Sequence, residues 1–280
     1  APVVVGGDVA VTEEGLRQSA TLDTLGLAVE ARYQSVGGYL EVTGAVSDLT
    51  GQDRAITVLF ALPVSDAPWL WWDSIARSRS PEGEPGELTN LETGMAWGYA
   101  GAHSKYPLGA ITWPQQAGLT LAIRMDEPVV HRILYNAALR LFLISFDFGL
   151  VPENNVHGVP LSRAPFRFLI YRHDPQWGFR SALQRYYDFF PEFFVRRARL
   201  EGGWYVWGNA ADTPGAKEAG FAFHWGPSGL DAVRWDNEND FLSLCYIEPE
   251  FFQLTMGDYD RAPNPEEGLE RLRRIAEGDE

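Results

Sequence analysis

Short alternating strands fill residues 1–175 and constrain the fold more than any other feature of this sequence. The clearest runs cover residues 25–33, 39–46 and 55–62, where apolar and polar residues alternate or β-branched and aromatic residues dominate. More strands are predicted over residues 110–112, 119–125, 132–136, 139–147 and 166–172. Many short strands with glycine and proline between them predict a large antiparallel β-sandwich over residues 1–175.

The pattern changes after Asp174 and Pro175. Over residues 176–201 we expect a connecting amphipathic helix, because apolar side chains recur at the spacing of one helix face: Phe179, Leu183, Tyr186, Tyr187 and Phe190. Residues 202–280 then predict strands at 204–207, 219–226 and 241–247 and a helix at 266–277. The apolar strand at 204–207 is expected to be buried. The acidic stretch 231–240 is interpreted as a polar loop rather than a calcium site. Strands followed by helices indicate the beginning of a parallel α/β unit.

The chain is acidic, with 38 Asp and Glu against 23 Lys and Arg and a net charge of −15. Such a chain repels phosphate backbones and anionic lipid headgroups, so nucleic acid and membrane surfaces are poor partners. Neutral sugars are indifferent to this charge. The first residue is Ala1, so a removed signal peptide and a fragment of a longer chain both stay open. An exported or periplasmic location is favoured, with a cytoplasmic one still open.

Several local motifs carry a resemblance to a known type of enzyme across most of the chain. They are Asp53 to Thr57, Trp69 to Asp73, Tyr106 with Pro107, Trp177 to Ala182, Tyr186 with Tyr187, Phe190 with Pro191, and Gly202 to Trp204. The layout resembles glycoside hydrolases that place a β-supersandwich before a (β/α)8 barrel. The resemblance implies that residues 202–280 begin a catalytic barrel. It also implies a carbohydrate ligand and the degradation of a polysaccharide through a carboxylate acid/base mechanism.

Length is where the chain departs from that layout. A (β/α)8 barrel needs about 250 residues, and residues 202–280 leave room for two or three of its strands. We therefore expect an incomplete barrel, completed by a second chain or by a C-terminal continuation, and no turnover by this chain alone. The alternative is a non-catalytic carbohydrate-binding or structural β-sandwich module of a multichain assembly. A weaker option makes the aromatic stretch described next a subunit interface.

Residues 68–107 interrupt the strand pattern and hold the first candidate site. Indole rings can lie flat on the apolar C–H faces of sugars, and an acid beside them could bind a hydroxyl group. The candidates for substrate binding are Trp69, Trp71, Trp72, Trp97 and Asp73. Each tryptophan could equally be core filler, and strand alternation would put Trp69 and Trp71 on one face and Trp72 on the other.

The other candidates follow the predicted strands of residues 202–280. Active sites of (β/α)8 enzymes lie at the carboxyl ends of the strands, which favours Glu248 and Glu250 as catalytic residues over Asp258 and Asp260. His224 and Trp225 are candidates for substrate binding, or a structural pair. The five histidines show no metal-ligand spacing and no phosphate-binding loop is present, so we expect neither metal nor cofactor. Cys245 is expected to be inert core.

Overall fold

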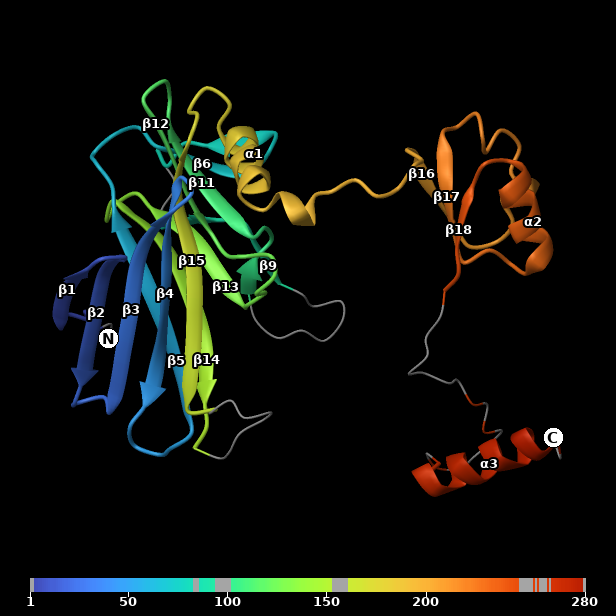
Figure 1. Cartoon of the computed structure of the whole chain (residues 1–280), viewed down its shortest axis with the longest axis horizontal. Coiled ribbons are helices and arrows are strands. Elements are labelled where there is room, and N and C mark those ends of the chain that lie inside the picture. Colours follow the sequence, from blue (N-terminus) through green and yellow to red (C-terminus); the bar gives the residue numbers. More distant parts are fainter. Residues whose placement is uncertain are drawn as a thin grey trace. The chain divides into compact units, whose positions relative to one another are not determined.

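The computed structural model describes residues 3–82, 86–93, 102–152, 161–246, 254, 256, 261 and 263–278. The chain divides into two compact units, Ala1–Val195 and Arg196–Glu280. Among the described residues the first unit holds three sheets and the second unit one (Figure 1). Each unit also has its own core. The finer boundaries predicted at residues 175 and 201 stay predictions.

Nine antiparallel strands form the larger sheet of the first unit, in the order β1-β2-β3-β4-β15-β12-β11-β6-β7. Their bounds, in the same order, are Asp8–Thr12, Gly15–Leu22, Leu27–Val36, Tyr39–Asp48, Arg163–His173, Ala117–Ala122, Leu108–Trp113, Leu70–Ser74 and Arg77–Arg79. The strands predicted over residues 25–33, 39–46 and 166–172 are confirmed as β3, β4 and β15. Sequence analysis missed β1 and β2, whose side chains are mostly exposed and carry no apolar stripe.

Four antiparallel strands form a second sheet, in the order β5-β14-β13-β8. They are β5 (Arg54–Pro63), β14 (Leu141–Leu150), β13 (His131–Asn136) and β8 (Glu87–Thr89). A separate short pair consists of β9 (Leu91–Thr93) and β10 (Ala102–Ser104). Because β6 and β7 extend the nine-stranded sheet and β8 extends this one, three segments of residues 68–107 are part of the sandwich. Describing the whole stretch as an insertion was wrong.

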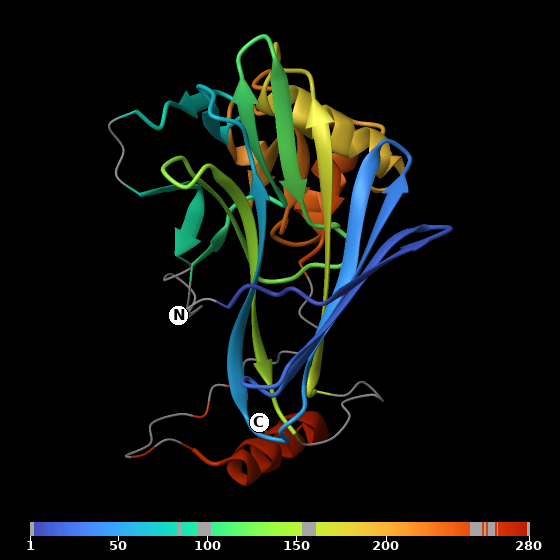
Figure 2. The same ribbon diagram turned by 90° about the vertical axis from the view of Figure 1, so that its left-hand side faces the viewer.

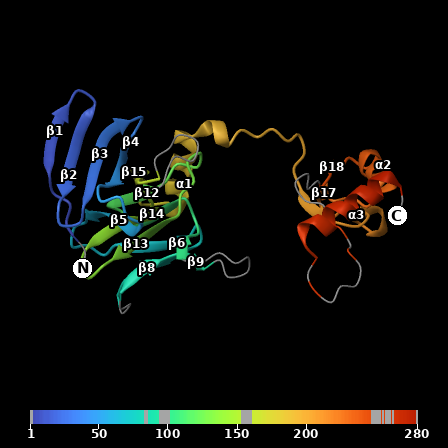
Figure 3. The same ribbon diagram turned by 90° about the horizontal axis from the view of Figure 1, so that it is seen from below.

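The two sheets lie face to face (Figures 2 and 3). Large apolar side chains from both fill one core between them. From the larger sheet come Val42, Trp71, Ile111 and Phe168, and from the smaller come Ile133, Phe142, Ile144 and Phe146. All eight are nearly inaccessible to solvent. Burial of such area is the main favourable term in folding, so the predicted large antiparallel sandwich and mainly β class are confirmed.

A helix covers the other side of the larger sheet. Side chains alternate along β15, so that Phe168 enters the sandwich core while Leu169 and Tyr171 pack under α1 (Phe179–Phe189). Hydrogen bonds fix the helix: the Tyr171 hydroxyl donates to the Ala182 carbonyl at 2.9 Å, and the Tyr186 hydroxyl to the Ile123 carbonyl at 2.8 Å. The predicted helix face is therefore the buried face.

Three strands of the second unit run parallel, in the order β16-β17-β18. They are β16 (Gly203–Val206), β17 (Phe221–Trp225) and β18 (Leu242–Leu244), with α2 (Leu230–Glu238) between the last two. The predicted polar loop at 231–240 was wrong, because Ala232 and Asp236 of α2 are buried. Farther on, α3 (Pro265–Glu277) begins with an Asn264 and Glu267 capping box. The parallel α/β start is confirmed, and the barrel itself stays a proposal.

A buried histidine links β15 to its neighbours in the larger sheet. Thr112 Oγ1 lies 3.0 Å from His173 Nε2, and Thr120 Oγ1 lies 2.8 Å from His173 Nδ1. Trp72 donates its indole N–H to Thr112 Oγ1 at 2.9 Å. This chain of hydroxyl partners suits a neutral imidazole, which has one donor and one acceptor nitrogen. Burial lowers the pKa of His173 to about 4.

The first prediction concerns acid sensitivity. Because the folded pKa of His173 is below the unfolded value of about 6.5, the unfolded chain binds the proton first. The free energy of unfolding should therefore fall as the pH drops from about 6.5 to about 4, with His173 contributing about 3 kcal/mol, and should lose nothing more from this group at lower pH. Urea unfolding of the wild type and of His173→Gln across this range would measure it. Parallel pH profiles for the two proteins would contradict this assignment.

Candidate functional site

One row of side chains crosses the parallel sheet beneath α2. The strand register places Tyr205, His224 and Ser243 side by side. His224 Nδ1 lies 2.9 Å from both carboxylate oxygens of Asp236, which comes from α2, and Ser243 Oγ donates to Asp236 Oδ2 at 2.6 Å. His224 and Asp236 are completely buried. Because a carboxylate can be buried only with partners, this network fastens α2 to β17 and β18.

His224 is therefore a structural group rather than part of an exposed surface. Its Nε2 has no hydrogen-bond partner among the described residues, and its ring meets that of Tyr205 edge-on at 5.1 Å. Of the two roles considered from the sequence, substrate binding and structural support, the geometry favours structural support for His224. The next residue, Trp225, lies on the opposite face of the sheet because side chains alternate along a strand.

Three aromatic rings gather at the carboxyl ends of the three parallel strands. Trp207 follows β16, Trp225 ends β17, and Tyr246 lies two residues past β18. The Trp207 and Trp225 rings are 4.9 Å apart, and the Tyr246 ring lies 5.3 Å and 5.4 Å from them. Trp207 is 49% exposed and Tyr246 47%. We call these three residues the strand-end aromatic cluster, and it is an exposed apolar platform with a phenol group at its side.

Trp207 is held in this cluster in a strained backbone conformation. Its φ of 61° lies in the left-handed region, which is unfavourable for a bulky side chain. Its N–H donates to the Trp225 carbonyl at 2.7 Å, which ties β16 to β17 at this point. Gly226 makes room for the ring, because a Cβ there would lie 2.3 Å from Trp207. Strained residues of this kind concentrate at functional sites, so the strain points to function here.

The face of the sheet opposite α2 is apolar and partly bare. Strand register puts Trp204, Phe223 and Leu242 in one row, and Val206, Trp225 and Leu244 in the next. Trp204 is 55% exposed and Leu242 45%. The predicted buried character of residues 204–207 was therefore wrong for this chain. Alternation along each strand separates this face from the row beneath α2.

The candidates of the sandwich lie mostly in its core. Trp69 and Trp71 are buried between the sheets, whereas Trp72 packs beneath α1, so the predicted alternation is confirmed. Trp72 lies against Gly178, where a Cβ would be 2.1 Å from its ring. Asp73 binds Arg79 through two hydrogen bonds of 2.7 Å and 2.8 Å, and also accepts from the Trp71 indole. All four residues already have structural partners.

Five candidates, Trp97, Glu248, Glu250, Asp258 and Asp260, lie outside the described residues. Cys245 is exposed just past β18, so its expected place in the core was wrong. Within the part of the chain that the structure describes, no group of His, Cys, Asp or Glu is placed to hold a metal ion. No helix in that part is long and apolar enough to cross a membrane.

Sequence reasoning missed Trp207 and Tyr246. The signal was present, because each is the first aromatic residue beyond the end of a parallel strand, and the rule that selected Trp225 applies to both. Trp207 was instead included within a predicted strand, and Tyr246 within another. Both strands are shorter than their apolar patterns suggest.

The second prediction tests the buried network. Asp236→Ala should lower the free energy of unfolding of the second unit by about 3 kcal/mol, because it leaves buried polar groups of His224 and Ser243 unpaired. Asp231→Ala is the matched control on the same helix, with a side chain 93% exposed, and should change it by less than about 0.5 kcal/mol. Urea unfolding of the purified chain would measure both. Equal stabilities of the two variants would refute the structural role of Asp236.

Comparison with known proteins shows what this fold resembles. No family model matches the sequence, and no curated protein matches it. Among solved structures, GH36 α-galactosidase AgaB from Geobacillus stearothermophilus is similar with a TM-score of 0.50 and 13% identity, over 89% of this chain and 42% of that chain. AgaA from the same organism gives a TM-score of 0.49 and 14% identity over 84% and 39%. The α-galactosidase from Lactobacillus brevis gives 0.44 and 13% over 80% and 34%. This chain thus spans about two fifths of the length of AgaB or AgaA, and shares its fold with that part of AgaB.

Proposed function

We propose that this chain is part of a glycoside hydrolase and that the strand-end aromatic cluster binds a sugar ring. The observation that carries the proposal is the meeting of Trp207, Trp225 and Tyr246 at the carboxyl ends of three consecutive parallel strands. Parallel α/β enzymes bind their ligands at this edge. The fold shared with part of the α-galactosidase AgaB supports a carbohydrate ligand.

The cluster suits a sugar for physical reasons. A pyranose presents apolar C–H groups on its ring faces and hydroxyl groups around its rim. Exposed indoles such as that of Trp207 offer a flat apolar surface for the ring face, while the Tyr246 hydroxyl can bond to the rim. The Trp207 N–H bond to Trp225 and the ring contacts with Trp225 and Tyr246 set the platform before a ligand arrives, which reduces the entropy lost on binding.

The bare face of the parallel sheet supports an incomplete barrel. In a (β/α)8 barrel the helices cover one face of the strands, and the other face packs inside against side chains of the remaining strands. Here α2 covers one face, while Trp204, Val206 and Leu242 on the other are each about half exposed. We propose that a C-terminal continuation or a second chain covers this face.

Hydrolysis would use a pair of carboxylates, one as acid and the other as nucleophile or base. Glu248 and Glu250 follow Tyr246 closely in the sequence and are the proposed catalytic candidates. Because AgaB is an α-galactosidase, an α-galactoside is the first substrate to test.

A non-catalytic sugar-binding module is the second candidate function. It is favoured by the aromatic cluster itself, which needs no other group to stack on a sugar. The two functions differ in whether bond cleavage follows binding.

The third prediction tests sugar binding. Trp207→Ala should weaken the affinity of the chain for a neutral α-galactoside oligosaccharide about tenfold or more, because it removes half-exposed stacking area. Trp177→Ala, which removes another exposed indole in the first unit (56% exposed), should leave affinity unchanged. Isothermal titration calorimetry would measure both. Equal losses in the two variants would exclude the cluster as the binding site.

The fourth prediction separates the two functions. Residues 1–280 alone should release no sugar from an aryl α-galactoside, because the barrel is incomplete. Together with the polypeptide that covers the bare face, release should appear, and Glu248→Gln or Glu250→Gln should lower it by a factor of about 1,000 or more if either is catalytic. Their matched control is Glu266→Gln, on the first turn of α3. Sugar binding without release in the completed protein would favour the non-catalytic module.

A further inference from the structure

A row of arginines crosses the larger sheet of the first unit. The strand register places Arg17 of β2 opposite Arg32 of β3, Arg32 opposite Thr43 of β4, and Thr43 opposite Arg167 of β15. Arg163 precedes Arg167 by four residues in β15 and therefore lies on the same face of the sheet. In a chain of net charge −15, this concentration of cations is unexpected.

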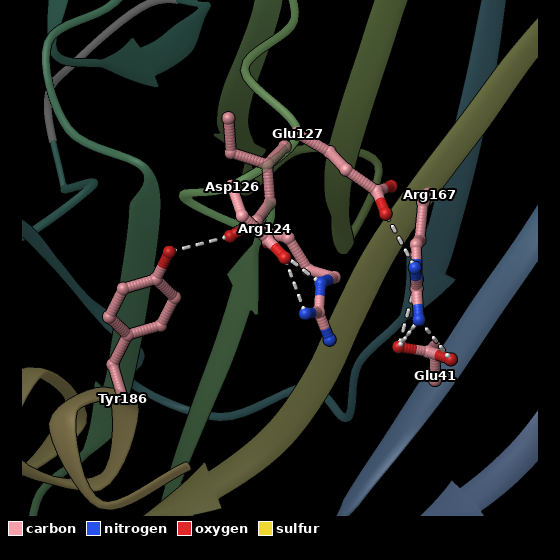
Figure 4. A network of polar contacts seen from close by, with 7 residues as sticks. Glu41, Arg124, Asp126, Glu127, Arg167 and Tyr186 are labelled. Atoms are coloured by element: carbon pink, nitrogen blue, oxygen red, sulfur yellow. Dashed lines mark hydrogen bonds and ion pairs between the residues drawn. The ribbon is translucent and has the colours of Figure 1, made fainter. Parts of the chain in front are cut away.

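Several nearby carboxylates are already engaged with other groups. Glu13 and Glu14 border a smaller pocket together with Arg17 and Arg32, but among the described residues no hydrogen bond or ion pair joins either acid to these arginines. Arg167 donates two hydrogen bonds of 3.0 Å to Glu41 and one of 2.6 Å to Glu127 (Figure 4). Glu30 pairs with Arg163. In the same close-up, Asp126 is bound to Arg124 (Figure 4). These acids therefore neutralise Arg124, Arg163 and Arg167.

Arg17 and Arg32 are left without such partners. Neither guanidinium has a hydrogen bond or an ion pair with any residue that the structure describes. Like charges directly opposite each other on neighbouring strands destabilise a sheet. An anion placed between them would remove this repulsion, and a carboxylate matches the fork of donors that a guanidinium presents.

The two arginines line a cleft of about 820 Å³. Arg163 and Arg167 also contribute to it, and its apolar wall includes the partly exposed Val129 and Phe148, with the buried Phe166 behind them. A volume of this size is within the range of small-molecule sites, which combine apolar walls with a few placed polar groups. The cleft thus offers both an anchor for a negative charge and apolar surface for the body of a ligand.

We infer that this cleft is a second binding site, which takes a saccharide that carries carboxylate groups. Arg17 and Arg32 clamp the carboxylate, and the apolar wall contacts the ring faces of the sugar. The site is separate from the strand-end aromatic cluster, since it lies wholly in the first unit. The choice of a sugar rests on the proposed function, whereas recognition of a carboxylate does not.

The experiment uses the full chain and calorimetric titration with an oligogalacturonate and with a neutral oligosaccharide of equal length. The uronate should bind, and its affinity should fall as salt is added, because part of the attraction is between charges at a solvent-open cleft. Arg17→Gln with Arg32→Gln should weaken uronate binding at least about tenfold. The matched control is Arg197→Gln with Arg199→Gln, which removes the same charge from exposed positions outside the cleft and should leave binding unchanged.

A second measurement guards against a folding defect. Without ligand, Arg17→Gln with Arg32→Gln should melt at the wild-type temperature or above it, because the substitutions remove repulsion between exposed groups. The uronate should raise the melting temperature of the wild type and of the control variant, and raise that of the double variant by much less.

Three outcomes would overturn the inference. The first is that the uronate does not bind the wild type. The second is that the two double variants bind the uronate with equal affinity. The third is that the neutral oligosaccharide binds as tightly as the uronate and loses affinity in Arg17→Gln with Arg32→Gln. If acetate binds the cleft as tightly as the uronate does, at equal carboxylate concentration, the inference that the ligand is a saccharide would be overturned. Loss of neutral-sugar binding in Trp207→Ala reports on the strand-end aromatic cluster alone, so failure of that proposal and failure of this one are distinguishable.

Discussion

The buried contact between His224 and Asp236 is the interaction on which the second unit depends. A carboxyl group with no exposure to water is stable only when its oxygens have hydrogen-bond partners, and here His224 and Ser243 supply them. The contact joins a helix to two strands that are separate in sequence. The strand that carries His224 also carries Trp225, a ring of the exposed aromatic cluster, on its other face.

The two faces of the parallel sheet have different solvent environments because side chains alternate along each strand and α2 covers one face. Tyr205, His224 and Ser243 face α2, so Trp204, Phe223 and Leu242 must face the other way. Covering only one side of a parallel sheet leaves apolar area in water, which such sheets normally avoid. The bare face and the strained Trp207 at its edge are the two features on which the proposed binding of a sugar and of further polypeptide rests.

The sandwich uses its two faces differently as well. Its inner face is a dense aromatic and aliphatic core in which Trp71 meets Phe142 edge-on at 6.5 Å. On its outer face α1 covers Leu169 and Tyr171, whereas the neighbouring region carries paired acids and arginines. Most of these charges offset one another at little net gain, as surface pairs usually do. Arg17 and Arg32 are the exception, and the absence of a described partner for them gives the cleft its character.

The sequence by itself determined the elements whose side chains follow a clear period. Alternation marked β3, β4 and β15, and the spacing of Phe179, Tyr186 and Phe190 marked α1, because burial on one side leaves a repeat that local inspection can find. It also separated Trp71 from Trp72. Only the tertiary structure decided which groups meet. The pairing of Arg17 with Arg32 depends on strand register, the contact of His224 with Asp236 on the docking of α2, and the cluster of Trp207, Trp225 and Tyr246 on three parallel strands ending at one edge. Each of these joins residues distant in the chain, and no local pattern encodes such a distance.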